Sequence, residues 1–356
     1  MMNCKRLLVT VICICWAAIS FSQNNTIEFY TDKSPRLRGM MGPTFLDEAG
    51  VRELGRWGAN HIRWQLTWDG FPHSAADNAN KEEYRNWLNG ALAHVDKMLP
   101  VCQELGIKVL IDLHTLPGGR MEDYNHRMFT DKVWQDEFIS IWKEIAAKYK
   151  DNPTVWGYDI ANEPQDGRVE NGALNWPTLA SVVAHDIRAI DANHPIIVEA
   201  RGGDVGTLAR FQTIDVPGLV YSFHMYVPHS FTHQNISGKK KTFRYPGYVG
   251  LKRWNKDVVR KVLDEIKDWQ AKNNTQIYVG EFSAIRWAPG DDAYNYLKDC
   301  IDIFEEYNWS WVYHAFREYH GWSVEHGGVK EDETPAKEPT SRQQLFMDAF
   351  KKNIRQ

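Results

Sequence analysis

The amino-acid sequence predicts a closed barrel of eight parallel strands, each followed by a helix. Apolar runs of strand length alternate with runs whose apolar residues recur at helical spacing, and this alternation repeats eight times in 356 residues. Several strand-like runs are apolar at successive positions, as in parallel strands that helices cover on the outside. The length suits one large barrel domain with loop insertions, so the fold class is a single (β/α)8 barrel.

The expected strands follow one another along nearly the whole chain. They are 37–41, 60–64, 109–114, the first part of 155–164, 195–199, 219–224, 277–281 and 310–316. The expected helices are 47–55, about 81–105, 134–149, 178–190, 206–211, 251–269, 293–307 and 345–350. Thr130 is a suitable N-cap for the third helix and Gly106 a suitable end for the second. A doubly wound open sheet is the alternative, but the sequence lacks the Gly-x-Gly-x-x-Gly turn that would support it.

The helix expected over 251–269 has a pronounced apolar face. Its apolar positions are Leu251, Trp254, Val258, Val262, Ile266 and Trp269.

The first residues resemble a secretion signal. Lys5 and Arg6 precede an apolar run over 7–18, and the small residue Ser22 suits cleavage. The run is short for a membrane span. We therefore expect a signal peptide over 1–22, cleaved near Ser22, a secreted, periplasmic or cell-surface product, and a catalytic domain over 23–356.

Cysteine use agrees with export. Three of the five cysteines lie in the first 22 residues, and one of them, Cys15, could carry a lipid anchor, although Ile14 before it argues against this. Cys102 and Cys300 lie in separate helical patterns, so we expect two buried free thiols. A domain of this size has core enough to dispense with a disulfide.

Composition narrows the class of partner. The formal charge is −4 and there is no basic stripe or polybasic cluster, which argues against nucleic acid and against an anionic membrane surface. Trp, Tyr and Phe number 15 each, and aromatic faces stack on sugar rings. A large core explains the same tryptophan count equally well, so composition suggests a carbohydrate ligand without establishing one.

Polar side chains follow the ends of several predicted strands. Active sites of such barrels lie at the C-terminal ends of the strands, so these groups are expected to gather in one place. Any one of them could instead be a surface ion pair or a packing residue, and their shared position is what favours a site. The candidates are Arg63, His114, Asn162, Glu163, His224, Tyr226, Glu281 and His314.

Glu163 and Glu281 end the fourth and seventh strands and are expected to face each other across the mouth of the barrel. Two carboxyl groups flanking a glycosidic bond are the machinery of glycoside hydrolysis. One group has to be protonated while the other is ionised, so their environments must separate their pKa values. A glutamate beside Arg63 and the Tyr226 hydroxyl would be held ionised, whereas a neutral amide and aromatic rings would favour the protonated form.

Five motifs together resemble glycoside hydrolase family 5, the cellulase family. They are Ala59-Asn60-His61-Ile62-Arg63, Asp112-Leu113-His114, Asn162-Glu163-Pro164, His224-Met225-Tyr226 and Gly280-Glu281-Phe282. The resemblance spans about 37–350 and implies a retaining glycosidase. It implies Glu163 as general acid/base and Glu281 as nucleophile, and it implies no metal or organic cofactor.

The resemblance also implies supporting roles. Asn162 would hydrogen-bond the substrate 2-hydroxyl. Arg63 and Tyr226 would position the nucleophile, and His114 and His224 would line the site near the bond that is cut.

One residue departs from the family pattern. Family members usually place a Trp at the end of strand eight as a platform for sugar, and here His314 stands at that point. Trp322 in the following loop is then a candidate for the platform, unless the alignment is off by one residue. Trp68, Trp287 and Glu318 are further candidates for sugar contacts, with ordinary packing or solvent roles equally compatible.

The sequence thus predicts a secreted, monomeric β-glycosidase that acts on a β-glycan by double displacement, with endo-β-1,4-glucanase as the first choice. A β-mannanase or another β-glycan hydrolase is the runner-up. A non-catalytic carbohydrate-binding barrel would keep the aromatics and lose a carboxylate. A metal-dependent hydrolase could use His114, Glu163, His224 and Glu281 as ligands, but it would usually show a His-x-His pair on an early strand.

Overall fold

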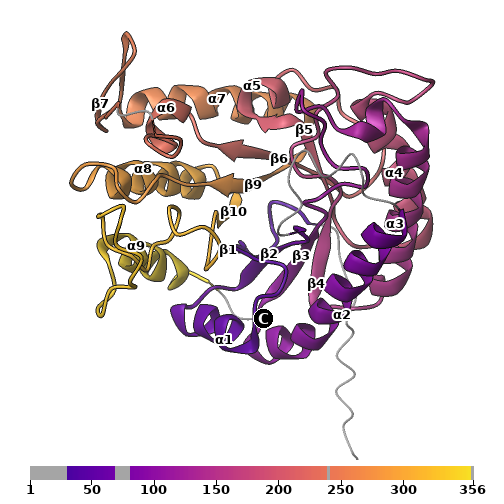
Figure 1. The fold of residues 1–356 in the computed structure, drawn as a ribbon, viewed down its shortest axis with the longest axis horizontal. Coiled ribbons are helices and arrows are strands. Elements are labelled where there is room, and N and C mark those ends of the chain that lie inside the picture. The colour runs from indigo at the N-terminus through magenta and orange to yellow at the C-terminus, as the bar shows by residue number, and fades with distance from the viewer. Residues whose placement is uncertain (1–29, 69–80, 239–240, 354–356) are drawn as a thin grey trace, which may run out of the picture.

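Eight parallel strands close into a barrel in the computed structural model, which describes residues 30–68, 81–238 and 241–353. Figure 1 shows the strands at the centre and the helices around them. The order around the barrel is β1-β2-β3-β4-β5-β6-β9-β10, and β10 pairs with β1 to close it. The strands are β1 Arg38–Gly42, β2 His61–Gln65, β3 Lys108–Asp112, β4 Val155–Asp159, β5 Ile196–Asp204, β6 Leu219–Met225, β9 Gln276–Phe282 and β10 Ser310–Tyr313. The predicted (β/α)8 barrel is confirmed.

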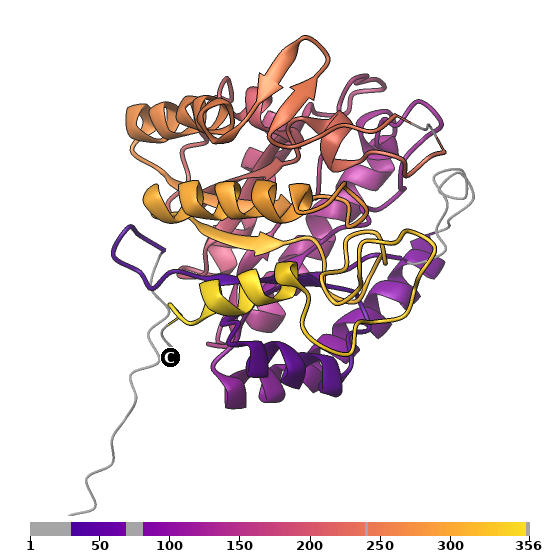
Figure 2. The ribbon, with the colours of Figure 1, turned by 90° about the vertical axis from the view of Figure 1, so that its left-hand side faces the viewer.

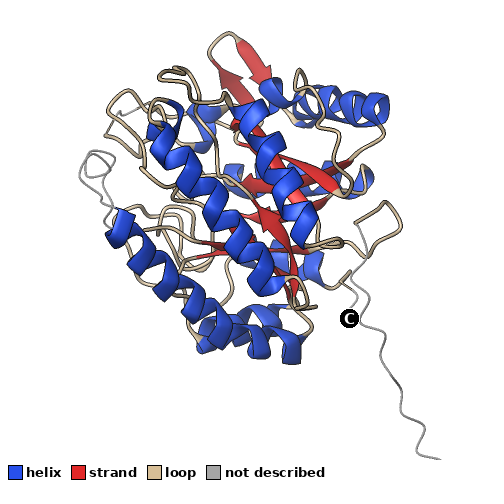
Figure 3. Cartoon of the chain, turned by 90° about the vertical axis from the view of Figure 1, so that its right-hand side faces the viewer, coloured by secondary structure: helices blue, strands red, loops and turns tan. Residues whose placement is uncertain are grey.

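Helices cover the outside of the barrel, and Figure 3 shows them lying over the strands. Side-chain caps start several of them: Asp47, Asn175 and Thr340 each accept a hydrogen bond from a backbone N–H in the first turn. The main helices are α1 Glu48–Trp57, α2 Lys81–Leu105, α3 Lys132–Tyr149, α4 Trp176–Ile190, α7 Lys256–Asn273, α8 Asp292–Glu306 and α9 Ser341–Phe350. Shorter pieces are η2 Arg127–Phe129, α5 Val205–Leu208 and α6 His229–Thr232.

Two local predictions were wrong. Thr130 does not cap α3, because it ends the preceding short helix η2, and the carboxylate of Asp131 accepts the bond from Val133 N–H instead. The predicted apolar face over 251–269 was also shifted. Its first residues supply the second strand of a hairpin made by β7 (Gly247–Val249) and β8 (Lys252–Trp254). The hairpin stands away from the barrel in Figure 2, and Leu251 in its turn is exposed. The buried residues of α7 are Val259, Leu263, Ile266 and Trp269, of which the last two were predicted.

Two apolar clusters stabilise the fold. The larger one fills the space between the strands and the helices, and Cys102 and Cys300 are buried in it as free thiols, as predicted. A smaller cluster fills the inside of the barrel. It comprises Tyr30, Met41, Leu110, Ile197, Val220, Tyr278, Val312 and Ala315. The predicted signal segment 1–22 lies outside the described residues.

A buried histidine lies inside the barrel near the start of the strands. The ring nitrogens of His61 lie 3.0 Å from the Lys108 carbonyl oxygen and 2.9 Å from the Tyr278 hydroxyl, and its ring packs edge-on against Trp156. Burial lowers the pKa of His61 to about 3, so this imidazole is neutral.

A helix needs both length and apolarity to cross a bilayer, and this applies to each helix in the described ranges. None of them combines the length and the apolarity that a membrane crossing needs.

Candidate active site

The structure brings the two predicted carboxylates together at the C-terminal end of the barrel. Glu281 is the penultimate residue of β9, and Glu163 lies in the loop that follows β4. One carboxylate oxygen of each and a ring nitrogen of His224 all lie within 4.8 Å of one another. The prediction that these two strands lie on opposite sides of the barrel was wrong, because only β5 and β6 separate them on one side. Groups from β5 and β6 therefore lie between the carboxylates.

Arg63 on β2 is fully buried and contacts most of the acidic groups of the site. Its Nε donates to Asp159 at 2.8 Å and its Nη1 to Glu281 at 2.7 Å. Its Nη2 contacts Glu199 (3.0 Å), Asn162 (3.1 Å) and Asp112 (3.3 Å). A guanidinium carries its donors in a fixed planar fork, so this single side chain sets the positions of groups from several strands.

The surroundings of Glu281 hold it ionised. Arg63 donates to one carboxylate oxygen, and the Tyr226 hydroxyl donates to the other at 2.7 Å. Burial raises the pKa of Glu281, but the positive charges of His224, His314 and Arg63 outweigh it and hold that pKa well below its usual value. Arg63 and Tyr226 contact this glutamate as expected, but the charges of His224 and His314 lower its pKa more than that of Arg63 does.

The surroundings of Glu163 differ from the expectation. Its carboxylate is partly exposed, and Nδ1 of His224 lies 2.9 Å from its Oε1. Burial raises the pKa of Glu163, but the bond to cationic His224 outweighs it and lowers that pKa. The predicted neutral surroundings that would favour the protonated form are therefore wrong for this protein without substrate, because an imidazole occupies the position next to the carboxylate.

Asn162 lies between Arg63 and His114. Its Oδ1 accepts from Arg63, and its amide nitrogen lies 3.2 Å from Nε2 of His114. Nδ1 of His114 bonds Asp112 at 2.9 Å. If Nδ1 carries the proton, Nε2 accepts from the amide, so both side chains have fixed orientations.

His314, just after β10, contacts the nucleophile candidate rather than serving as an aromatic platform. Nδ1 lies 2.6 Å from the Tyr226 hydroxyl and 3.3 Å from Glu281 Oε2, and Nε2 lies 3.1 Å from Glu318. Burial lowers the pKa of His314, but Glu318 and Glu281 raise it to about 10. A positive charge therefore stands where the family pattern places a Trp.

The three candidate tryptophans have different surroundings. Trp322 is 6% exposed, and its ring packs near Tyr226 and His314, so it forms a wall of the site with little free face. Trp68 lines a cavity beside Glu163 and stacks on Trp87. Trp287 is half-buried, and its indole N–H donates to a main-chain carbonyl, so its evident role is to brace a loop.

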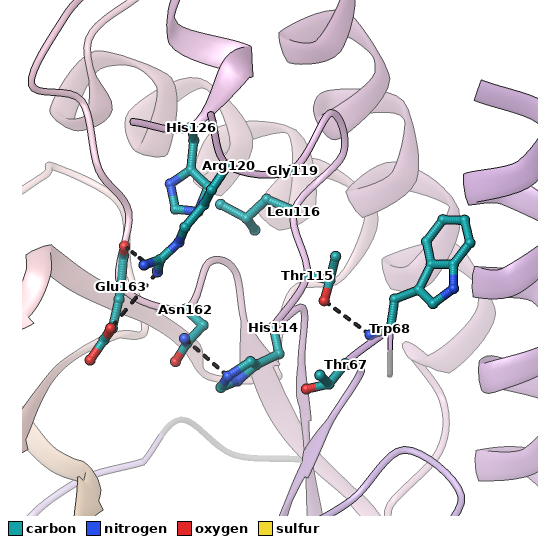
Figure 4. A pocket seen from close by; sticks show the side chains of 10 residues that line it. All are labelled: Thr67, Trp68, His114, Thr115, Leu116, Gly119, Arg120, His126, Asn162 and Glu163. Carbon is teal, nitrogen blue, oxygen red and sulfur yellow. Dashed lines mark hydrogen bonds and ion pairs between the residues drawn. The ribbon is translucent and has the colours of Figure 1, made fainter. Parts of the chain in front are cut away.

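The cavity beside Glu163 has a volume of about 310 Å³ and lies over the ends of β2, β3 and β4. Figure 4 shows Arg120 directed at Glu163 on one side of the cavity, and Trp68 on the opposite side. Arg120 lies 3.8 Å from the Glu163 carboxylate, and its Nε donates to His126. Arg120 and His126 were not predicted as site residues, because they lie in a long loop without strand periodicity.

The loop between β10 and α9, which carries Trp322, is fixed by one buried arginine. Arg286 donates to main-chain carbonyls only within this loop. The accepting carbonyls are those of His320, Gly327, Val329, Lys330 and Asp332. The loop therefore keeps its shape through its backbone.

Sequence reasoning missed Glu199, a fully buried residue of β5. It contacts Arg63, the ring of His224 and the backbone N–H of Glu163. The signal was present, because 195–199 is an apolar strand that ends in Glu, like the strands that end at Glu163 and Glu281.

Among the residues that the structure describes, one group has the spacing to hold a metal ion, namely Glu163, His224 and Glu281. Two carboxylates and an imidazole suit a divalent transition metal. The guanidinium of Arg63 already bonds Glu281, however, and a neighbouring positive charge opposes a cation at this place.

Comparison with known proteins agrees with the geometry. A family model described as Cellulase (glycosyl hydrolase family 5) matches residues 23–320. Endoglucanase C of Acetivibrio thermocellus is 26% identical over 292 residues, which cover 74% of this chain and 82% of the relative.

Solved structures share the fold. Thermotoga maritima Cel5A in complex with cellobiose superposes with a TM-score of 0.67 at 21% identity, covering 88% of this chain and 98% of the other. A structure of the same enzyme in complex with mannotriose gives 0.63 at 21% identity, covering 87% and 96%. The match of the family model covers most of the chain, so the chain belongs to glycoside hydrolase family 5, the cellulase family, and is a glycosidase that acts on glycans.

Proposed function

We propose that this protein is a retaining β-glycan hydrolase that works by double displacement. The observation that carries the proposal is the carboxylate pair, with oxygens of Glu163 and Glu281 within 4.8 Å of each other. Retaining enzymes hold their two carboxyl groups about 5–5.5 Å apart, whereas inverting enzymes need about 6.5–9.5 Å to admit a water molecule.

In the proposed mechanism Glu281 attacks the anomeric carbon while Glu163 protonates the leaving oxygen. Glu163 then removes a proton from the water that frees the sugar from Glu281. The ionised state of Glu281 supports its role as nucleophile. Arg63 and Tyr226, which donate to its two oxygens, would aim it at the substrate.

The remaining polar groups have proposed roles in binding. Asn162, held between Arg63 and His114, would bond the sugar 2-hydroxyl. The cavity between Trp68 and Glu163 would take a sugar unit next to the cleaved bond, with the indole as an apolar wall. His224 would hydrogen-bond Glu163, and the positive charge of His314 would keep Glu281 ionised.

For the substrate we propose a β-1,4-glucan cut internally, as the name of Endoglucanase C and the cellobiose complex of Cel5A suggest. A β-mannan is the second candidate, favoured by the mannotriose complex of Cel5A. We also propose export from the cell, supported by Lys5, Arg6 and the apolar run 7–18.

The test is a panel of soluble β-glucan, β-mannan and β-xylan, with the anomer of the first product followed by NMR. We expect wild type to release the β-anomer and Glu281→Ala to lose at least about 10⁴-fold in kcat. Initial release of the α-anomer would refute double displacement. Unchanged hydrolysis by Glu281→Ala would refute the nucleophile.

The two other classes are tested with the same panel. A metal-dependent hydrolase would lose activity after exhaustive treatment with a chelator, whereas the proposed mechanism retains it. A non-catalytic binding barrel would migrate more slowly in a gel that contains the polysaccharide, but it would release no reducing ends.

A further inference from the structure

The acid role of Glu163 requires a proton at a carboxyl group whose pKa is lowered in the protein without substrate. Nδ1 of His224 lies 2.9 Å from Oε1 of this carboxyl group. Burial lowers the pKa of His224, but the carboxylates of Glu199, Glu281 and Glu163 raise it well above its usual value. The proton that this pair shares therefore rests on the imidazole, directly beside Glu163.

Glu199 fixes both members of the pair. Its Oε1 lies 3.0 Å from Nε2 of His224, and its Oε2 accepts the backbone N–H of Glu163 at 2.9 Å. Glu163 has φ +45°, a left-handed conformation that is strained for a non-glycine residue and has to be held by its surroundings. A buried carboxylate with these contacts orients the ring and the acid relative to each other.

Two glycines let the imidazole lie at this place. A Cβ on Gly203 would lie 2.8 Å from Nδ1 of His224, and one on Gly280 would lie 2.5 Å from Oγ of Ser222 and 3.2 Å from Nε2 of His224. Contacts of this length leave no room for a larger residue without moving the ring. The glycine at 203 therefore leaves room for the ring of His224, and the one at 280 leaves room for this ring and for Ser222.

We propose that Glu199, His224 and Glu163 form a proton relay in which Glu199 positions the imidazole and the imidazole stores the proton that Glu163 delivers. This inference rests on the proposed function, because it needs Glu163 as the acid. Glu199 is a positioning residue, since it acts through its two partners and does not reach the bond that is cut.

The relay balances over both halves of the reaction. In the first half the proton moves from Nδ1 of His224 to Oε1 of Glu163 and then to the leaving oxygen as the glycosidic bond breaks. The neutral imidazole keeps its Nε2–H bond to Glu199. In the second half Glu163 takes a proton from water as the water oxygen bonds the anomeric carbon and Glu281 leaves, and this proton returns to His224.

Other charged groups face the relay and enter its pH dependence. Glu281 lies 3.5 Å from His224 and favours the imidazolium, whereas Arg120 lies 3.8 Å from Glu163 and favours its ionised form. The remaining neighbours are Arg63, which bonds Glu199, and His229 and His233, whose pKa values the charge of Glu163 raises against the effect of burial.

The test compares wild type with Glu199→Gln on two aryl β-glycosides of one sugar, a 2,4-dinitrophenyl glycoside and a 4-methoxyphenyl glycoside. The first leaving group departs without a proton and the second needs one. We expect kcat/KM to fall about 10²-fold for the methoxyphenyl glycoside, the scale of general acid catalysis, and less than about threefold for the dinitrophenyl glycoside. The alkaline limb for the methoxyphenyl glycoside should move to lower pH, because a neutral Gln stabilises the imidazolium less.

Controls separate this outcome from damage to the fold. Asp159→Asn removes another buried carboxylate that bonds Arg63. Asp159 bonds neither Glu163 nor His224 in the described structure, so any loss should be equal for both substrates. Glu199→Asp keeps the charge and should retain the alkaline limb, with melting temperatures measured for all variants. Equal losses for both substrates in Glu199→Gln, or no loss, would overturn the relay. A wild type that releases no reducing ends from any member of the polysaccharide panel would instead overturn the proposed function.

Discussion

His61 and His224 are both buried inside the same barrel, yet their pKa values are shifted in opposite directions. His61 lies near the start of the strands, between a carbonyl and a tyrosine hydroxyl, and burial lowers its pKa to about 3. His224 lies at the other end, where burial acts in the same sense but neighbouring carboxylates raise its pKa well above the usual value. Burial lowers the pKa of both imidazoles, and the groups that each ring contacts then determine whether it is protonated. Chemistry is therefore confined to the end where acidic residues terminate the strands.

Replacing Arg63 by Lys should have the largest effect on the charged end of the barrel, on both stability and activity. One ammonium group cannot reach all the carboxylates that the guanidinium contacts, and buried charges left without a partner cost about 3–5 kcal/mol. We expect loss of that order in the free energy of unfolding by urea, together with a higher acid limb of kcat/KM as the pKa of Glu281 rises. Arg38→Lys is the matched control, because Arg38 on β1 pairs with Glu305 alone among carboxylates in the described structure. An equal loss of unfolding free energy in the two variants would contradict the role of Arg63 as the shared partner of several carboxylates.

His314→Gln should have an intermediate effect. Removing this positive charge beside Glu281 should raise the pKa of the nucleophile and lower kcat/KM at pH 6 about tenfold, which corresponds to about 1.4 kcal/mol. In the folded protein the pKa of His314 is about 10, above its ordinary 6.5. Its contribution to stability is thus complete below pH 6.5 and is lost between pH 6.5 and 10, by up to about 1.4 kcal/mol per pH unit.

Urea unfolding from pH 6 to 10 measures this contribution. The curve of stability against pH should be flatter for His314→Gln than for wild type over that range. A variant that keeps the wild-type slope would show that His314 is neutral.

His61→Gln should have the smallest effect, and only on stability. A buried side-chain hydrogen bond contributes about 0.5–1.5 kcal/mol, so the cost at pH 7 should lie in that range. The folded pKa of about 3 lies below the ordinary 6.5, so wild-type stability is lost as pH falls from 6.5 towards 3, and the variant should lose less there. The pH profile of kcat/KM should be unchanged. A shifted profile would show that the two ends of the barrel are coupled.

Much of the fold follows from local patterns. The period of the apolar residues identified all eight barrel strands, because each strand has to be apolar on both faces. The pattern failed at 251–269, where hairpin and helix adjoin and share apolar residues. Only the packing against α8 and the barrel decides which face of α7 is buried.

The site was predictable as a set of residues and not as a set of charges. Glu163 and Glu281 could be named because they end apolar strands. The state of Glu163 could not, since it depends on an imidazole 61 residues away. The contacts of Glu199 likewise connect it with β2, β6 and the loop after β4, which are distant in the chain, so no local sequence pattern predicts them.

The way Arg286 holds the loop after β10 has a consequence for how this chain can diversify. It bonds main-chain oxygens, which every residue type supplies, so the exposed side chains of this loop can vary while the anchor persists. Sugar preference can then drift by substitution on the loop without a change in the residues that break the bond. Directed evolution of a new specificity should therefore keep Arg286 fixed and randomise the exposed loop positions.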